Sequence, residues 1–383
     1  MAYSVKRCAS LLLLALLLSS PAAAASAWED QRIGDDLRYE GLGAAIEQSL
    51  IYLWNRPENT SFPLLGTTVS RKHLIRSLLF FRNLIQSSPS PELLALELTT
   101  YFDVYPISGT CADSRQHMLV TGYYQPVFAG SLTRKPPYVY PLYGIPDNLV
   151  RRWNPEHQKL ETGRLRQGRF LPYWTRAEIE KQGHARGFEL VFLKDPFDAF
   201  LLHIQGSGLI RLRDGSLRAI HYALKNGRPY KSIGKYMIRT GRLRKNNKGI
   251  SSIRQYLADH PEEQEEILHY NPSFIFFSWS AEQRAVGNLG RPLTAHRSIA
   301  VDQHCLPAAG LALLRSQKPK LDKEPGSCTP FSRFVLAQDT GSAIRGPCRV
   351  DLFWGTGSEA GRAAGMMKQS GELSFLLLKK KFL

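Results

Sequence analysis

The stretch 338–357, QDTGSAIRGPCRVDLFWGTG, constrains the fold of this chain most, because it sets two aspartates against apolar, strand-like runs. Asp339 ends one apolar run, and Asp351 lies within the next run, twelve positions later. Glycines follow both aspartates, and glycine lets a ligand or another segment approach the backbone closely. Carboxylates held on strands in this way are candidates for acid–base chemistry.

The surroundings predicted for Asp351 favour a proton donor. Alternate residues of a strand face opposite sides, so Asp351 should lie opposite Val350 and Leu352 and beside Arg349 and Phe353. A carboxyl group among apolar and aromatic side chains loses solvation, which raises its pKa. A general acid that works near neutral pH requires such a shift. The alternative is a structural aspartate paired with Arg349.

Other catalytic interpretations fit the residues less well. Asp-Thr-Gly-Ser at Asp339 matches one loop of a pepsin-like protease, but the second loop of that class is missing, because GTGS at 355–358 lacks the acid. Asp339 can also be a turn-capping residue. Ser207, in the sequence QGSG, resembles a nucleophile elbow only superficially, because a hairpin pattern follows it instead of a helix. Asp302 follows a third apolar run, and the histidines show no metal-site spacing.

Length and charge limit the class of protein. The 383 residues suffice for two domains, and a hydrophobic fraction of 43% argues against disorder. The formal net charge of +17 favours an anionic partner, which can be nucleic acid, a phospholipid surface or an acidic polymer. The basic residues are scattered and form neither a zinc finger nor a basic helix beside a heptad pattern. A solvated basic surface is the alternative.

Residues 1–27 have the layout of a cleaved export signal. Lys6 and Arg7 precede the apolar run Leu11–Leu18, and an Ala-rich stretch with Ala-x-Ala sites ends at Ala25 or Ala27. The apolar run is too short to cross a bilayer, and no later segment is long and apolar enough. The mature chain is therefore predicted to be exported with a charge of 17 − 2 = +15.

Cysteine usage leaves the disulfides open. Cys8 precedes the apolar run, so it cannot be a lipid-attachment cysteine at a cleavage site, and it leaves with the signal. The four that remain are Cys111, Cys305, Cys328 and Cys348. An even number in an oxidising compartment is compatible with one or two disulfides, and four free thiols are the alternative.

Periodicity divides the chain into a helical start and a β-rich middle. Apolar residues at helical spacing predict helices over 28–53, 73–85 and 91–102. Between 118 and 240, runs rich in aromatic and β-branched residues predict a compact, mainly antiparallel β region with a helical insert at 176–183. The predicted strands are 120–128, 138–143, 189–193 and 197–205, with a hairpin of 209–212 and 217–222 around Asp214-Gly215 as a type I′ turn.

The last third returns to mixed structure. We predict a helix over 251–270, a polar loop over 316–327, a short helix over 358–367 capped by Ser358, and a final strand over 373–379. The β region is dense in tyrosines, a few of which can stack on sugar rings. These tyrosines are Tyr123, Tyr124, Tyr138, Tyr140, Tyr143, Tyr222 and Tyr230.

A series of motifs resembles one known family. QDTG-x-AI-x-G at 338–346, followed by RVD-x-FWG at 349–355, is similar to the 3D domain with its three aspartates, which the chain carries over 299–357. Upstream, four further motifs stand in the order found in the membrane-bound lytic murein transglycosylase A family. They are TGYY-x-P at 121–126, HIQGSG at 203–208, NG-x-x-Y-x-SIG at 226–234 and NPSF-x-FF at 271–277. The resemblance runs from about residue 30 to 380.

The resemblance implies a mainly β fold with helices in two domains. A double-psi β-barrel catalytic domain would be built from 28–117 and 241–383, and a smaller β-barrel domain over 118–240 would be inserted into it. A glycan groove would lie between them. The implied reaction cleaves the β-1,4 bond between N-acetylmuramic acid and N-acetylglucosamine in peptidoglycan without water, leaving a 1,6-anhydromuramic end. The alternative is a non-catalytic periplasmic glycan-binding protein.

By motif position, Asp351 resembles the catalytic acid, with Asp339 as its neighbour. An ionised Asp339 would raise the pKa of such an acid by repulsion and stabilise developing positive charge. The residues that the resemblance places at the substrate are Thr121, Gly122, Tyr124, Gln205, Ser207, Gly208, Asp302 and Gly341. It implies neither a metal nor another cofactor.

The resemblance also implies partners and location. The expected partners are peptidoglycan glycan strands and, as candidates, proteins of cell-wall synthesis or division, with no nucleic acid. The protein is expected to be monomeric and periplasmic, with outer-membrane association as an open alternative. Two departures stand out: the family usually has glycine where Ser342 stands, and many members are lipoproteins, whereas this chain lacks a lipid-attachment cysteine.

Overall fold

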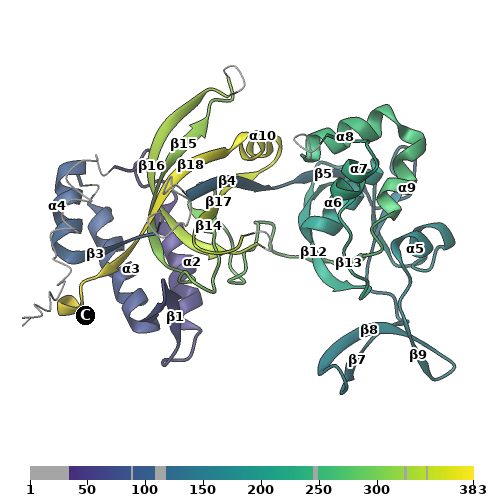
Figure 1. The fold of residues 1–383 in the computed structure, drawn as a ribbon, viewed down its shortest axis with the longest axis horizontal. Coiled ribbons are helices and arrows are strands. Elements are labelled where there is room, and N and C mark those ends of the chain that lie inside the picture. Colours follow the sequence, from purple (N-terminus) through teal and green to yellow (C-terminus); the bar gives the residue numbers. More distant parts are fainter. Residues whose placement is uncertain (1–33, 88, 108–117, 245–248, 323–325, 342–343) are drawn as a thin grey trace, which may run out of the picture.

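The computed structural model describes residues 34–87, 89–107, 118–244, 249–322, 326–341 and 344–383. The predicted export signal over 1–27 lies outside these residues, as do Cys8 and Cys111. The described chain is mainly β with helices, as predicted, and it forms two lobes that lie side by side (Figure 1). Among the described residues, no helix combines the length and apolar character that a membrane span requires.

One lobe is built around a closed ring of six strands. The order is β15-β16-β14-β17-β4-β18, an additional pairing of β15 with β18 closes the ring, and β3 lies outside it against β18. The pairs β14–β16 and β17–β4 are parallel, and the other pairs of the ring are antiparallel. The bounds are β3 (Phe102–Pro106), β4 (Met118–Gln125), β14 (Ser298–Ala300), β15 (Leu311–Pro319), β16 (Cys328–Asp339), β17 (Arg349–Thr356) and β18 (Lys368–Leu378).

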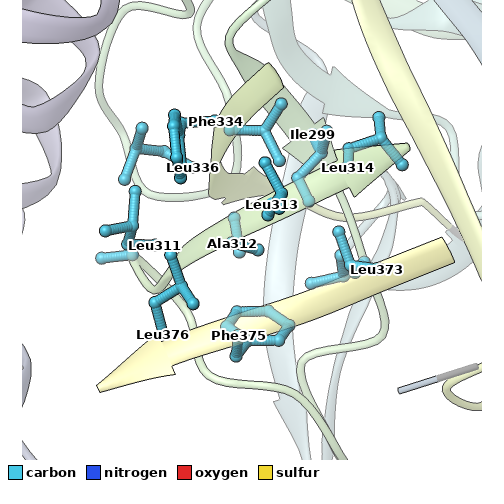
Figure 2. Packing of buried hydrophobic residues seen from close by; sticks show 14 of the residues in the cluster. Ile299, Leu311, Ala312, Leu313, Leu314, Phe334, Leu336, Leu373, Phe375 and Leu376 are labelled. Atoms are coloured by element: carbon cyan, nitrogen blue, oxygen red, sulfur yellow. The ribbon is translucent and has the colours of Figure 1, made fainter. Parts of the chain in front are cut away.

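Apolar side chains fill this lobe and join the ring to the helices outside it. Figure 2 shows Leu313, Phe334 and Phe375, from β15, β16 and β18, within one buried cluster. Helices pack on the ring from outside, α2 on β16 and α3 on β18. The outer elements are α2 (Leu42–Trp54), α3 (Arg71–Gln86), α4 (Pro91–Tyr101), α10 (Ser358–Met366), the 3-10 turn η3 (Lys380–Phe382) and the hairpin of β1 (Ser61–Leu64) and β2 (Thr67–Ser70).

The other lobe holds a six-stranded sheet of order β13-β12-β11-β5-β10-β6, a separate sheet of order β7-β8-β9, and helices. Its strands are β5 (Val127–Ser131), β6 (Tyr140–Tyr143), β7 (Leu149–Asn154), β8 (Lys159–Arg166), β9 (Arg169–Pro172), β10 (Glu189–Leu193), β11 (Ser207–Arg211), β12 (Leu217–Lys225) and β13 (Ile275–Ser280). Its helices are α5 (Arg176–Gln182), α6 (Pro196–Gln205), α7 (Ile233–Arg239), α8 (Ile250–Asp259), α9 (Gln264–His269) and the 3-10 turn η2 (Pro261–Glu263).

The chain passes between the lobes at two places. After β4 it leaves the ring and enters β5 in the other sheet, and after β13 it returns to β14. The Gln125 side chain spans this crossing, because its Nε2 donates to the backbone oxygen of Gln283 at 3.3 Å and its Oε1 accepts from Thr356 at 2.9 Å. The chain therefore passes from one sheet to the other within 118–131 and returns after 280. The boundaries at 118 and 240 stay a prediction about domains.

Helices predicted from apolar spacing are confirmed where serine caps them. Ser70 and Ser90 accept the backbone N–H groups of the first turns of α3 and α4. Of the helix predicted over 28–53, residues 28–33 lie outside the described part of the chain. In the rest the helix begins at Leu42, because Arg38, Tyr39 and Gly41 have positive φ angles that no α-helix contains. The helix predicted over 251–270 is interrupted at Pro261, which cannot continue α8.

The strand predicted over 197–205 is wrong, because these residues form α6. Asp195 caps the helix through the Phe197 N–H group at 2.8 Å, and Pro196 occupies its first turn. The helix is buried on several sides, so its sequence is apolar almost throughout. A continuous apolar run with aromatic residues is also typical of a buried strand, which explains the wrong prediction. Gly206 ends the helix with a φ of 80°, which allows β11 to begin at once.

Other sequence expectations need smaller corrections. The predicted hairpin of β11 and β12 is present, but its turn is not type I′, because Arg211 pairs with Leu217 and only Gly215 has a positive φ. Ser358 does not cap α10, since Gly357 holds the cap position. The loop predicted over 316–327 is shorter, because β15 continues to 319, and the final strand begins at 368. Cys348 is disulfide-bonded, whereas Cys305 and Cys328 are free thiols.

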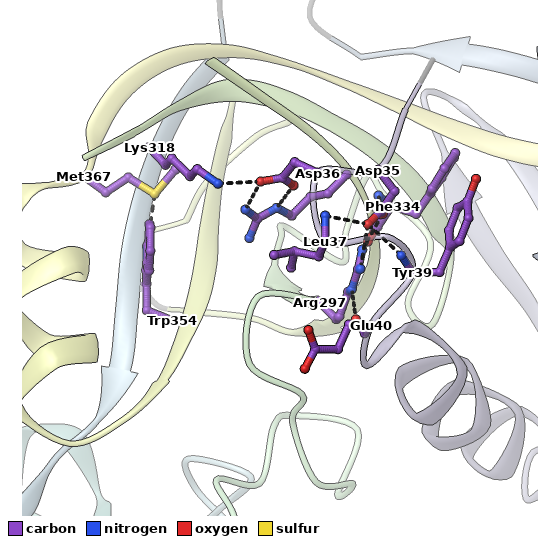
Figure 3. A network of polar contacts seen from close by, with 11 residues as sticks. Asp35, Asp36, Leu37, Tyr39, Glu40, Arg297, Lys318, Phe334, Trp354 and Met367 are labelled. Atoms are coloured by element: carbon purple, nitrogen blue, oxygen red, sulfur yellow. Dashed lines mark hydrogen bonds and ion pairs between the residues drawn. The ribbon is translucent and has the colours of Figure 1, made fainter. Parts of the chain in front are cut away.

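Two buried arginines tie the segment before α2 to the ring. Arg297 is fully buried and donates to both carboxylate oxygens of Asp35, at 2.5 and 2.7 Å. Arg333 makes the same type of contact with Asp36, at 2.9 and 2.8 Å, and Lys318 adds a third donor at 2.7 Å (Figure 3). Bidentate pairs fix the geometry as well as the charge.

The Asp36 pair gives a pH-dependent contribution to stability. Burial alone would raise the pKa of Asp36, but the bonds and charges of Arg333 and Lys318 outweigh burial and lower it from 3.8. The stabilisation should therefore be complete above pH 3.8 and be lost as the pH falls through the lower pKa of the folded state. Urea titrations of wild type and Asp36→Asn should show a difference in unfolding free energy that shrinks in this acid range. A difference independent of pH would contradict the assignment.

Candidate active site

Three strands of the ring place two aspartates in one row. Ala300 of β14 pairs with Asp339 of β16 on one side and with Asp351 of β17 on the other. Asp351 in turn pairs with Thr121 of β4. Directly paired residues project from the same face of a sheet, and neighbouring strands lie about 4.8 Å apart, so the two aspartates share a face at roughly 10 Å between their Cα atoms.

A bulge in β16 brings Asp339 into this row. Ile299 pairs with Ala337, but Ala300 pairs with Asp339, so Gln338 is the extra residue. The Gln338 side chain is fully buried and its amide is bonded inside the core of the lobe. A one-residue shift exchanges the faces of a strand, so without the bulge Gln338 would stand in the row and Asp339 would point away from it.

Asp351 accepts hydrogen bonds from the side chains of two described residues, Thr121 and Arg349. The Thr121 hydroxyl donates to its Oδ1, and the Arg349 guanidinium donates to Oδ1 at 3.2 Å and to Oδ2 at 3.4 Å. The pairing with Arg349, which the sequence left open, is therefore present. The Asp351 side chain is 17% exposed, so one edge of the carboxylate remains accessible. Val350 and Leu352 point the other way into the core, as the alternation predicted.

Asp339 accepts three hydrogen bonds, and the pKa of its carboxyl group is raised. The Tyr123 hydroxyl donates to Oδ2 at 3.0 Å, and the backbone N–H groups of Asn288 and Thr340 donate to Oδ1 at 2.8 and 2.9 Å. Burial raises the pKa of Asp339, and the charge of Asp351 adds to the rise, against the lowering effect of these bonds. From the sequence we considered what an ionised Asp339 would do to Asp351, and the structure shows that the influence is mutual, because the charge of Asp351 also raises the pKa of Asp339.

Tyr123 completes the acidic face. Its ring lies 5.2 Å from that of Phe353, measured between centroids. Burial raises the pKa of Tyr123 well above 10, and the charges of Asp339 and Asp351 raise it further. The phenol therefore stays protonated near neutral pH and serves as a hydrogen-bond donor. The sequence placed Tyr123 in a motif and among the tyrosines that can stack on sugar rings, but it did not place the Tyr123 hydroxyl beside Asp339.

The third aspartate has a different environment. Asp302 follows β14, is 8% exposed, and accepts the backbone N–H groups of His304 at 3.0 Å and Gly346 at 2.7 Å. Burial raises the pKa of Asp302, but these two bonds outweigh burial and the pKa is lowered. Asp302 therefore stays ionised and joins the segment after β14 to the segment after β16. Gly341 lies two residues beyond Asp339 in this same loop.

The position next to Thr121 is occupied by a glycine, Gly122, because a larger residue would not fit there. A Cβ atom at Gly122 would lie 2.6 Å from the Trp354 ring nitrogen and 2.8 Å from the Cα of Ala364 in α10. We expect Gly122→Ala to lower the unfolding free energy by about 1–3 kcal/mol, as overpacking does. The matched control is Gly365→Ala in α10, where a Cβ meets nothing within 4 Å and should be neutral or stabilising. Equal urea midpoints for the two variants would contradict the packing argument.

The remaining residues that the resemblance implied lie away from the aspartate row. Gln205 ends α6, and Ser207 and Gly208 begin β11 in the other lobe, where Ser207 pairs with His221. Ser207 is followed by a strand, so it does not stand at a nucleophile elbow. Tyr124 projects from β4 against Gly361 of α10. Burial raises the pKa of Tyr124, as does the charge of Asp198 in the other lobe.

Two hollows lie in the second lobe. A shallow one of about 330 Å³, lined by Trp279, Arg218 and Gln283, adjoins the crossing between the lobes through Gln283. The larger one, of about 580 Å³, lies among β6, β10, α5 and α9. The described residues bring no three histidine, cysteine or carboxylate side chains together as a metal site would.

Comparison with known proteins matches both lobes to one family. A family model for the MltA specific insert domain matches residues 119–278, and one for the 3D domain matches residues 297–377. Membrane-bound lytic murein transglycosylase A of Escherichia coli K12 is 33% identical over 274 residues, which cover 71% of this chain and 68% of that protein.

Solved structures agree with these matches. A membrane-bound lytic murein transglycosylase from Agrobacterium tumefaciens has a TM-score of 0.69 and 28% identity, covering 90% of this chain and 94% of that chain. E. coli MltA with bound chitohexaose has a TM-score of 0.63 and 25% identity, covering 87% of this chain and 89% of that chain.

Proposed function

The chain belongs to the membrane-bound lytic murein transglycosylase A family, and from this membership we propose that Asp351 breaks the glycan strand of peptidoglycan. The function is lytic cleavage of the β-1,4 bond between N-acetylmuramic acid and N-acetylglucosamine. The product ends in 1,6-anhydromuramic acid. The observation that supports Asp351 is its place in the row, accessible and bonded to Thr121 and Arg349.

The proposed reaction uses one carboxyl group twice. Protonated Asp351 gives its proton to the glycosidic oxygen while positive charge develops at C1 of the muramic sugar. The C6 hydroxyl of the same sugar then attacks C1, and its proton passes to the Asp351 carboxylate. The proton taken up equals the proton given, so no water is consumed. The attacking hydroxyl is already tethered to the reacting ring, which lowers the entropy cost.

Asp351 suits this cycle better than its two neighbours. The oxygens of Asp302 are held by backbone N–H groups, and Asp339 is held by two backbone groups and a phenol. Asp351 is bonded to the Thr121 hydroxyl, whose hydrogen can rotate, and to the Arg349 guanidinium on a long side chain, so both contacts can adjust as a proton is passed. Asp339 and Asp351 repel one another when both are ionised, so each opposes ionisation of the other.

Neighbouring groups support the charge changes. When Asp351 has given up its proton, Thr121 and Arg349 stabilise the carboxylate that remains. A negative charge on Asp339 would stabilise the oxocarbenium-like sugar across the row. Tyr123 holds Asp339 in place as a permanent donor. These are positioning contributions, since only Asp351 exchanges a proton with the sugar.

We assign the fold details on the same basis. The closed ring of six strands supports a double-psi β-barrel as the catalytic domain, and the lobe entered at β5 and left after β13 is the insert. The glycan strand would then lie between the lobes, next to the crossing at Gln125. The hollow beside Trp279 adjoins this path, and an exposed indole is a suitable platform for a sugar ring.

We also propose a periplasmic location. The export pattern over 1–27, together with the charge of 17 − 2 = +15 expected of the mature chain, fits an enzyme that meets the negatively charged cell wall. Glycan strands are the partner that the function requires. Association with the outer membrane, a monomeric state and contacts with proteins of cell-wall synthesis or division remain parts of this proposal.

Purified sacculi provide the test. The wild-type protein should bind sacculi and release soluble muropeptides. Sedimentation with the sacculi, with no soluble product, would favour a glycan-binding protein instead. Pepstatin-sensitive cleavage of peptides would favour a protease.

A further inference from the structure

The larger cavity of the second lobe is separate from the aspartate row, and no step of the proposed reaction uses it. It encloses about 580 Å³ between β6, β10, α5, α6 and α9. This volume lies within the range of about 300–1,000 Å³ that small-molecule sites occupy. Its walls combine aromatic rings with seven charged side chains. They are Arg134, Arg176, Glu180, Lys181, Arg186, Glu189 and Glu265.

Ion pairs neutralise one end of this cavity. Arg176 contacts Glu180 at 2.9 Å, and His269 contacts the other oxygen of Glu180 at 2.7 Å. Lys181 pairs with Glu265 on the same wall. These contacts leave little net charge on the α5–α9 side.

The rest of the lining keeps an excess of positive charge. The guanidinium groups of Arg134 and Arg186 have no hydrogen-bond or ion-pair partner among the described residues. Glu189 is the one acid of the lining outside the pairs above, and its Oε2 already accepts the Gly187 N–H group at 2.8 Å. Outside the pairs, the lining therefore holds two guanidinium groups and one carboxylate, so a further negative group would be attracted.

Tyr143 adds a hydroxyl to the lining that Arg134 and Arg186 share. It is 6% exposed, lines the cavity, and its hydroxyl has no partner in the part of the chain that the structure describes. Burial raises the pKa of Tyr143 to about 12, the charges of Glu189 and Glu180 raise it, and those of Arg134 and Arg186 lower it. The hydroxyl is therefore a further donor in the lining that holds both arginines.

We propose that this cavity binds a peptide carboxylate through Arg134, Arg186 and Tyr143, and that the ligand is the stem peptide of peptidoglycan. The source of the peptide rests on the proposed function. A carboxylate has about four acceptor positions, which guanidinium N–H groups and a phenol can fill together. Glu189 beside the site disfavours a doubly charged anion such as phosphate, because like charges repel. The volume leaves room for several residues of the peptide.

Calorimetric titration of the full chain tests the proposal. The probe is a sugar-free stem tetrapeptide with free carboxylates. We expect binding by wild type and at least about 10-fold weaker binding by the double variant Arg134→Gln/Arg186→Gln, since charge-assisted bonds are worth about 1.5–3 kcal/mol each. Both arginines are exposed, so thermal melting should show an intact fold. The same peptide with amidated carboxyl groups should bind wild type at least about 10-fold more weakly.

The matched control is Arg213→Gln, which removes a charge from an exposed turn of the same lobe outside the cavity. It should bind the peptide as wild type does. Equal binding by the double variant, equal binding of the amidated peptide, or equally strong binding of inorganic phosphate would overturn the proposal. Wild type that cleaves peptide-free glycan strands but does not bind the peptide would refute this inference alone. Wild type that binds the peptide but cleaves no glycan would refute the proposed function.

Discussion

Asp351→Asn should reduce the release of muropeptides by about 10³-fold or more, because one positioned acid–base group contributes about 10²–10⁴-fold and this group serves in both steps. Asparagine keeps the shape of the side chain and an oxygen that accepts the Thr121 hydroxyl. It cannot carry the proton. The fold should persist, since the Asp351 side chain is partly exposed to solvent.

The matched control for this prediction is Asp339→Asn. It keeps an acceptor for Asn288 and Thr340, removes the charge next to Asp351, and should cause a smaller loss of activity. Initial rates on sacculi, with circular dichroism to verify folding, measure both. Full activity of Asp351→Asn, or an equal loss in the two variants, would contradict the assignment of Asp351 as the proton carrier.

Arg297→Met should cause the largest loss of stability, about 3–5 kcal/mol in the free energy of unfolding. Arg297 and the Asp35 side chain are at most 1% exposed, so the substitution leaves a buried carboxylate without its partner. It also removes donors to the backbone oxygens of Glu40 and Phe334. Chemical denaturation should show a lower midpoint with an unchanged slope.

Two further variants check the cause. Arg284→Met breaks a pair with Glu282 in which the arginine side chain is 63% exposed, and it should cost about 0–1 kcal/mol. The double variant Arg297→Met/Asp35→Leu should recover part of the loss, because no buried charge is left unpaired. A loss for Arg297→Met no larger than that for Arg284→Met would contradict the network in Figure 3.

Motifs with fixed spacing predicted the aspartates well, because a strand places its residues regularly. Asp351 faces away from Val350 and Leu352, as the alternation required. The bulge that turns Asp339 into the row was not predictable, since any residue of β16 can be the extra one. The partners Asn288 and Tyr123 come from distant segments, and no local pattern marks them.

The fold was predictable where local chemistry and packing agree. Serine caps and apolar spacing located α3 and α4, and Asp214-Gly215 located a turn. Residues 197–205 were wrongly predicted to form a strand. A helix buried on several sides is apolar throughout, so the helical spacing of apolar residues cannot be recognised in its sequence. The ring closes through the pairing of β15 with β18, and such long-range pairing leaves no trace in a local pattern.

The chemistry of the new chain end tests the central claim most directly. Sacculi are digested with wild-type protein in water labelled with a heavy oxygen isotope, and the muropeptides are measured by mass spectrometry. The proposed reaction predicts anhydro ends that are lighter than hydrolysed ends by one water and that carry no isotope label. Reducing ends that carry the label would show that water attacks the sugar, and would contradict the proposal that Asp351 passes one proton between two oxygens of the glycan.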